Sequence, residues 1–328
     1  MRSQQNIFVL QNLIIMKRFK KIAKWTGIIL LFIVAALTAL TATRQDLRFE
    51  APYPDIKAST DSVVIARGKH VVYSMAHCID CHSNENTDSL QQLGIEPVMS
   101  GGRKFEFELG KFYSRNITSD KETGIGKLTD AELARTLYYG VDSKGRAMID
   151  FMPFHNVSEE DMAAIISYLR TLKPVKNKVP ENEYSTMGKV LKAFLIKPVG
   201  PKGEIPKKVV KDTSAAYGSY IVNYVANCAG CHTQRGPTGE LVGEHLAGGN
   251  PFVEPGLDTL TPPNLTPHTE SRMYGWSKQH FIDRVRMGKL IKHSHMPWNS
   301  YKKMTDEELT AVYNYLQSVK PAPTTINK

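Results

Sequence analysis

Two copies of one short pattern constrain this 328-residue chain more than any other feature. Each copy is a pair of cysteines separated by two residues and followed at once by a histidine. The copies begin 150 positions apart and contain all four cysteines of the chain. On a helix, residues three and four apart share a face, so one turn presents both thiols and the imidazole together. The copies are Cys78-Ile-Asp-Cys81-His82 and Cys228-Ala-Gly-Cys231-His232.

The residues around these copies repeat as well, which indicates an internal duplication. Gly68 and Gly218 each stand ten residues before the first cysteine of their copy. Further along, Asn116-Ile-Thr118 in the first half corresponds to Asn264-Leu-Thr266 in the second half. We therefore expect two domains of one kind.

A helix of the same design is predicted near the end of each half. Ser158 and Thr305 suit the N-cap position, and an acidic residue follows three places later in both. Apolar residues then recur at i, i+3, i+4 and i+7, which is one face of an amphipathic helix. They are Met162, Ile165, Ile166 and Leu169 in the first half, and Leu309, Val312, Tyr313 and Leu316 in the second. Strand signals are poor, so we expect an all-α fold.

The composition and the distribution of prolines predict the domain organisation. With 41% hydrophobic and 23% charged residues, the composition is that of a folded protein. A proline-rich stretch separates the halves and predicts a linker over 179–207, with a short helical or apolar piece around 190–196. We assign 52–178 and 208–328 to the two domains, and 1–44 to a cytoplasmic N-terminus with a transmembrane anchor.

The anchor is expected because residues 25–42 form an uncharged apolar run preceded by five cations. Such a run is close to the ~20 residues that cross a bilayer. The cations predict a cytoplasmic N-terminus, natural from Met16 onward, with the chain beyond Arg44 outside the cytoplasmic membrane. A cleaved signal peptide is the alternative. The net charge is +10, but the position of these cations indicates a membrane rather than nucleic acid as partner. They are Lys17, Arg18, Lys20, Lys21 and Lys24.

The repeated pattern is the C-x-x-C-H motif that attaches haem covalently. Two thiols add to the two vinyl groups of one porphyrin, and the histidine reaches the iron from the same side. We expect two haem c groups, with His82 and His232 as proximal ligands. A zinc half-site and a redox dithiol share the C-x-x-C spacing. Each pair here has its own histidine and its own repeat, which favours haem.

A sixth iron ligand is expected from the methionine that precedes a proline in each half, Met152 and Met296. A thioether suits an electron-transfer iron and raises its potential, and the proline stiffens the loop that presents it. Met148 competes in the first half, because its spacing from the last helix is closer to that of the second half. Three histidines are alternative ligands that we assign instead to surface or supporting positions: His155, His293 and His295.

Other side chains are expected to support the sites. Aromatic residues are predicted to line the haem pockets or to pack between helices: Phe154, Tyr168, Trp298 and Tyr315. Three polar residues are candidates for hydrogen bonds to haem propionates: Arg103, Asn116 and Asn264.

From residue 60 onward, these features resemble class I cytochromes c in tandem. More closely, the chain looks like the membrane-anchored di-haem cytochromes c related to the cytochrome subunits of bacterial membrane-bound alcohol and aldehyde dehydrogenases. The stretches that carry the resemblance are 145–153, 116–118 and 158–169. It implies contacts of Gly68 with Tyr168 and of Gly218 with Tyr315, and it favours the methionine before proline over its competitor. Those dehydrogenase subunits carry three haems, whereas this chain has two motifs.

The function expected is electron transfer outside the cytoplasmic membrane. The donor would be a membrane dehydrogenase or a quinol-linked complex, and the acceptor a soluble cytochrome or an oxidase. The alternative is a di-haem enzyme such as a peroxidase or a thiosulfate dehydrogenase. An enzyme needs an open iron position, as catalytic metal sites do. Two closing methionines favour transfer over catalysis, and a ligand-binding sensor ranks last.

Overall fold

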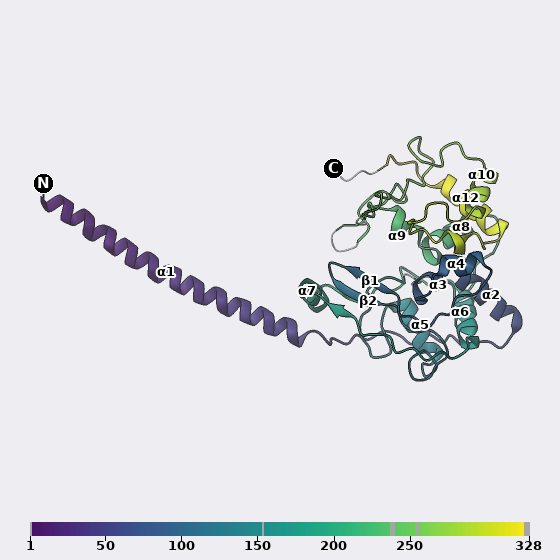
Figure 1. Cartoon of the computed structure of the whole chain (residues 1–328), viewed down its shortest axis with the longest axis horizontal. Coiled ribbons are helices and arrows are strands. Elements are labelled where there is room, and N and C mark those ends of the chain that lie inside the picture. The colour runs from purple at the N-terminus through teal and green to yellow at the C-terminus, as the bar shows by residue number, and fades with distance from the viewer. Residues whose placement is uncertain (1, 153, 237–239, 254–255, 325–328) are drawn as a thin grey trace.

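A long N-terminal helix and a mostly helical body make up the protein (Figure 1). The computed structural model describes residues 2–152, 154–236, 240–253 and 256–324. Helix α1 (Arg2–Thr43) extends away from the body, and its part from Ile15 to Thr43 is mostly exposed and contains an 18-residue window with a mean hydropathy of 2.2. This helix is long and apolar enough to cross a membrane.

Four helices follow one another in the same order in both halves of the body, as the repeat predicts, while α4 occurs only in the first half and α11 only in the second. In each half, a first helix leads into the C-x-x-C-H helix, and a later helix precedes the long last one. The first half contains α2 (Ser62–Tyr73), α3 (Cys78–His82), α4 (Thr87–Gln92), α5 (Asp130–Tyr139) and α6 (Glu159–Thr171). The second contains α8 (Ala215–Tyr220), the π-helical η1 (Ile221–Val225), α9 (Cys228–His232), α10 (Lys278–Arg286), α11 (Trp298–Tyr301) and α12 (Asp306–Ser318).

The first and last helices of each half pack tightly where a glycine removes the side chain. A Cβ atom on Gly68 would lie 2.9 Å from Cβ of Tyr168 and would strike the Ala164 carbonyl. A Cβ atom on Gly218 would lie 2.8 Å from Cβ of Tyr315, in the same arrangement. Both expected glycine–tyrosine contacts are therefore confirmed.

The last helices begin at the predicted N-caps. Ser158 accepts a hydrogen bond from the amide of Asp161, and Thr305 accepts one from the amide of Glu308. The carboxylate of Glu308 also accepts a hydrogen bond from the amide of Thr305, which completes a capping box. Asp161 makes no such return bond among the contacts described, because its carboxylate binds Arg67 instead.

A small three-stranded antiparallel sheet was not expected from the sequence. Its strands are β1 (Lys104–Phe107), β2 (Gly110–Tyr113) and β3 (Glu183–Tyr184), in the order β1-β2-β3. These strands are four residues or shorter, which leaves little alternation to detect. The third strand and helix α7 (Thr186–Phe194) come from the predicted linker, so this segment packs on the first half. The helical piece expected around 190–196 overlaps α7.

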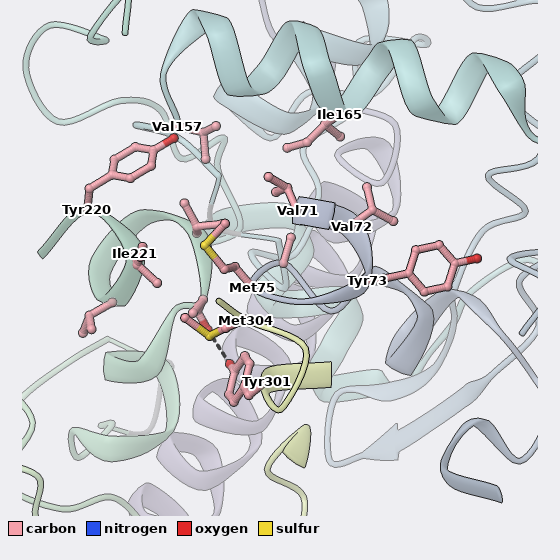
Figure 2. Close-up of a cluster of buried hydrophobic side chains, with 14 of the residues drawn as sticks. Val71, Val72, Tyr73, Met75, Val157, Ile165, Tyr220, Ile221, Tyr301 and Met304 are labelled. Atoms are coloured by element: carbon pink, nitrogen blue, oxygen red, sulfur yellow. Dashed lines mark hydrogen bonds between the residues drawn. The ribbon is translucent and has the colours of Figure 1, made fainter. Parts of the chain in front are cut away.

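One cluster of buried apolar side chains continues from the first half into the second (Figure 2). Met75 and Val157 contribute from the first half, and Tyr220, Ile221 and Met304 from the second. Burial of apolar surface is the main stabilising term in folding. The halves therefore form one packed body.

Candidate haem-binding sites

Each C-x-x-C-H motif forms one short helix, and the residue just before that helix has an unusual backbone conformation. The residue before the first cysteine is left-handed in both halves, with φ of 38° at His77 and 49° at Asn227. Histidine and asparagine are among the residues that tolerate this region best. The sharp entry starts each helix at the first cysteine, so the two thiols and the histidine lie on one turn.

The histidine of each motif is oriented by a backbone carbonyl. Nδ1 of His82 lies 2.7 Å from the carbonyl oxygen of Arg115, and Nδ1 of His232 lies 2.8 Å from that of Pro263. A carbonyl oxygen only accepts, so Nδ1 carries the proton and donates it. The Nε2 lone pair is then available to a metal. This arrangement is typical of metal-ligating histidines.

These two carbonyls were not expected from the sequence, although the repeat contains their signal. Arg115 and Pro263 directly precede the two Asn-x-Thr segments. Oδ1 of Asn116 accepts from the amide and hydroxyl of Thr118, at 3.0 and 2.7 Å. Its Nδ2 donates to the Val175 carbonyl at 2.8 Å. The segment thereby ties the histidine-binding carbonyl to the chain that follows the last helix.

The second half repeats this clamp. Asn264 accepts from the amide and hydroxyl of Thr266, both at 2.8 Å, and donates to the Ala322 carbonyl at 2.8 Å. Both asparagines are 2% exposed. Their amides are engaged within the protein, which disfavours Asn116 and Asn264 as hydrogen-bond partners of haem propionates.

Arg103 contacts the attachment helix itself. Its Nη1 donates to the carbonyl of Asp80, the residue before the second cysteine. In the second half, Nε of Arg235 donates to the carbonyl of Gly230 at 2.8 Å. The two arginines come from different points of the repeat but reach matching carbonyls. They satisfy the C-terminal end of each short helix, where carbonyls lack helical partners.

The protonation of these groups argues against the other uses of a C-x-x-C pair. Burial raises the pKa of the Cys78 and Cys228 thiols to about 12, whereas reactive dithiols have a lowered pKa. Burial also lowers the pKa of His82 and His232, which favours the neutral, metal-binding imidazole. Across the described part of the chain, no three His, Cys, Asp or Glu side chains group as a metal site would require. Among the described residues, the two cysteine pairs therefore do not come together as a shared zinc site.

The two candidate methionines occupy matching turns. The carbonyl of Met152 accepts from the amide of Phe154, and that of Met296 accepts from the amide of Trp298, both at 2.8 Å. Pro153 lies outside the described residues. Met148 differs, because it follows the bridge between Val141 and Ala147 and its amide donates to Gly140 at 2.8 Å.

The three histidines considered as alternative iron ligands each have different contacts. His155 is buried, with Nδ1 2.7 Å from the Tyr138 carbonyl and Nε2 3.0 Å from Asp150. Both of its nitrogens are thus engaged, which disfavours an iron ligand. The ring of His295 packs on that of Phe252, with the ring centres 4.6 Å apart and the planes tilted by 33°. Nε2 of His293 is buried without a hydrogen-bond partner within the described residues.

The tandem helical domains and their C-x-x-C-H helices define a class of covalent haem proteins. The family model for cytochrome c matches twice, over residues 65–173 and 215–320. The chain therefore belongs to the cytochrome c family, with two domains of this kind in tandem, and it binds two c-type haems.

Similar proteins include the cytochrome c subunit of a quinone-dependent alcohol dehydrogenase of Gluconobacter oxydans. It is 27% identical over 80% of this chain and 56% of the relative. The cytochrome subunit of fructose dehydrogenase of Gluconobacter japonicus is 25% identical, over 87% and 58%. A di-haem cytochrome c-type protein of Cereibacter sphaeroides is 25% identical, over 62% and 67%. The chain thus spans less than two thirds of the length of both dehydrogenase subunits.

Proposed function

We propose that the two motifs attach one haem each and that the chain transfers electrons between partner proteins. Haem supplies one-electron redox chemistry. Cys78 and Cys81 would form the thioether bonds of the first haem and Cys228 and Cys231 those of the second. The axial ligands would be His82 with Met152 and His232 with Met296. The observation that carries this proposal is the pair of oriented histidines, each with Nδ1 held by a carbonyl.

The contact between the halves suits transfer from one site to the other. Ser300 donates from Oγ to Oδ2 of Asp80 at 2.7 Å. Asp80 lies inside the first attachment motif, and Ser300 follows Met296 by four residues. A polar contact therefore joins the attachment helix of one site to helix α11, which follows the proposed methionine ligand of the other.

The donor is proposed to be a membrane dehydrogenase or a quinol-linked complex, and the acceptor a soluble cytochrome or an oxidase. The relatives named as dehydrogenase subunits support this choice. The test is to isolate the tagged full chain from native membranes in mild detergent and to identify the proteins that accompany it. We expect a dehydrogenase that reduces both haems when its substrate is added. Rapid binding of cyanide or peroxide by the isolated protein would contradict the proposal, because it indicates an open, catalytic iron.

The domains are proposed to lie outside the cytoplasmic membrane, held by α1 as an uncleaved single-pass anchor. The apolar part of α1 and the cations before it support this orientation. Protease added to intact spheroplasts should digest the chain beyond Arg44 and leave the N-terminus protected. A soluble mature protein that begins near Thr43 would instead identify the apolar segment as a signal peptide.

A further inference from the structure

Helix α7 leaves part of its apolar face exposed to solvent, unlike an ordinary surface helix. Met187, Val190, Leu191 and Phe194 follow one another at i, i+3, i+4 and i+7, which is one helical face. In a globular protein this face normally packs on the core. Here Met187 is 60% exposed and Val190 is 40% exposed, while Leu191 and Phe194 are half-buried.

The rest of α7 explains this orientation, because the residues turned toward the protein are small. Gly188 and Ala193 are buried. A Cβ atom on Gly188 would strike the carbonyl of Leu109, in the turn between β1 and β2. The ammonium of Lys192 lies 5.0 Å from the ring centre of Tyr184 in β3. The helix is therefore fixed to the sheet by its polar and small side, with the apolar side left outward.

Contacts with the end of α1 place α7 beside the apolar helix. Arg44 and Gln45 directly follow α1. Nε of Arg44 donates to the Ala193 carbonyl at 2.9 Å, and its guanidinium lies 5.4 Å from the ring centre of Phe194. Nε2 of Gln45 donates to the Lys189 carbonyl at 3.0 Å. Figure 1 shows α7 next to the end of α1 nearest the body.

We propose that α7 lies on the surface of the phospholipid bilayer, beside the point where α1 leaves the membrane. The inference rests on the proposed anchor, because α1 fixes the level of the bilayer. An interfacial helix buries its apolar face about 5–10 Å into the headgroup boundary and keeps cations at its polar edge. Lys189 and Lys197 are exposed, and Leu195, directly after α7, is 59% exposed. This contact would hold the first haem domain against the membrane.

The test uses the full-length protein with haems in vesicles of phosphatidylethanolamine and phosphatidylglycerol. Single cysteines are introduced by Val190→Cys in α7, Val63→Cys in α2 and Leu37→Cys in α1, and each is labelled with a nitroxide. Val63 is 74% exposed and serves as the matched valine control. Power saturation compares collisions with apolar oxygen and with a water-soluble nickel chelate. The same measurement under nitrogen gives, for each variant, the relaxation that the haem irons cause, and this value is subtracted.

We expect oxygen collisions to exceed nickel collisions at positions 190 and 37, and the reverse at position 63. If position 190 behaves like 63 while 37 lies in the bilayer, the inference fails and the anchor stands. If position 37 also behaves like 63, the anchor fails and the inference fails with it. Shielding of position 190 from both reagents would overturn the lipid proposal in favour of a protein partner.

Discussion

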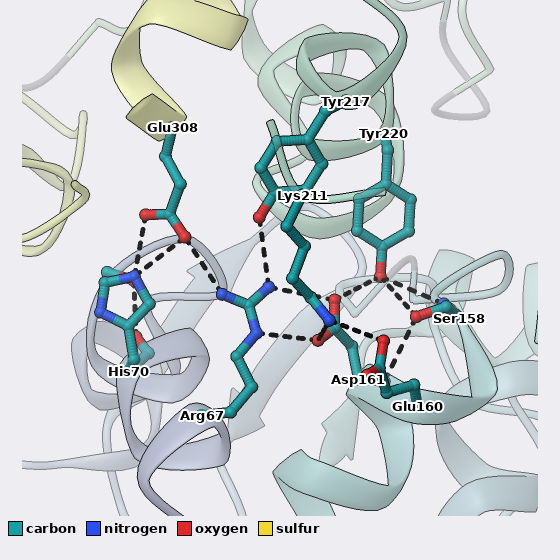
Figure 3. Close-up of polar contacts among 10 residues, drawn as sticks. Arg67, His70, Ser158, Glu160, Asp161, Lys211, Tyr217, Tyr220 and Glu308 are labelled. Atoms are coloured by element: carbon teal, nitrogen blue, oxygen red, sulfur yellow. Dashed lines mark hydrogen bonds and ion pairs between the residues drawn. The ribbon is translucent and has the colours of Figure 1, made fainter. Parts of the chain in front are cut away.

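Nη1 of Arg67, in the first helix of one domain, lies 3.1 Å from Oε1 of Glu308 in the last helix of the other. The same guanidinium binds Asp161 at 2.9 Å through Nε. Asp161 and Glu308 hold corresponding places in the repeat, so one arginine binds the first-turn acid of both last helices. Figure 3 shows this network, which also includes His70 and Tyr220.

Replacing Arg67 with methionine should destabilise the protein. Asp161 is fully buried and Glu308 nearly so, and each would lose its guanidinium partner. Removing one partner of a buried ion pair costs about 3–5 kcal/mol. Chemical denaturation followed by circular dichroism measures this loss. Lys104→Ala is the control, because its partner Glu106 is exposed, and it should have little effect. Equal stability of Arg67→Met and wild type would contradict the role of the network.

Stability should fall in acid because of the same carboxylates. Burial alone would raise the pKa of Asp161 and Glu308, but the hydrogen bonds and charges of Arg67 and His70 outweigh it and lower both. A lowered folded pKa stabilises the native state above the unfolded pKa values of about 3.9 and 4.3, and this contribution is lost as pH falls through the folded values. Calorimetry should show Tm decreasing below about pH 4. An Asp161→Asn variant should show a smaller decrease, and a parallel decrease would refute this assignment.

Serine at both cysteines of one motif should remove one haem and leave the other. Cys78→Ser with Cys81→Ser should halve the covalent haem per chain, because each motif supplies its own thioethers. Denatured mass measurement and the pyridine haemochrome assay provide the ratio. Cys228→Ser with Cys231→Ser should give the same half value. Wild type with a single haem, in a host that matures cytochromes c, would contradict the proposal.

Met152→Ala should open the first iron only. The thioether raises the reduction potential of the iron, and the choice of axial ligands changes that potential over a range of ~0.8 V across haem proteins. The potential of the first haem should therefore fall by a substantial part of that range. Spectroelectrochemistry should show the second haem nearly unchanged. Met296→Ala should do the converse, and Met148→Ala should leave both potentials near wild type. A high-spin first haem in Met148→Ala but not in Met152→Ala would reverse the ligand assignment.

Gly68→Ala should lower the stability of the first domain. The added methyl would meet Tyr168 and the Ala164 carbonyl, and overpacking costs about 1–3 kcal/mol. Gly218→Ala should cost a similar amount in the second domain. Gly200→Ala is the control, because its Cβ would meet only the Tyr139 ring, at an ordinary 3.4 Å. Thermal unfolding measures all three, and an unchanged Tm in Gly68→Ala would contradict the close packing.

Local patterns in the sequence were sufficient for the repeat, the attachment helices and the last helices. A cysteine pair with its histidine lies within five residues, and an N-cap with its acid within four. Their geometry follows from helical periodicity, which can be read directly from the order of the residues. The glycine–tyrosine contacts could be expected because both halves of the chain resemble class I cytochromes c. The methionine ligands remain a prediction, although their matching turns support them.

The sequence by itself was thus sufficient to select the residues proposed to bind the haems, while the tertiary structure decided how they are held. The carbonyls that orient His82 and His232 lie 33 and 31 residues away. Arg67 and Glu308 are separated by 241 residues. The outward face of α7 depends on which side the sheet and the end of α1 cover. Contacts of this kind form only after the chain has folded, because no local periodicity specifies a partner so far along it.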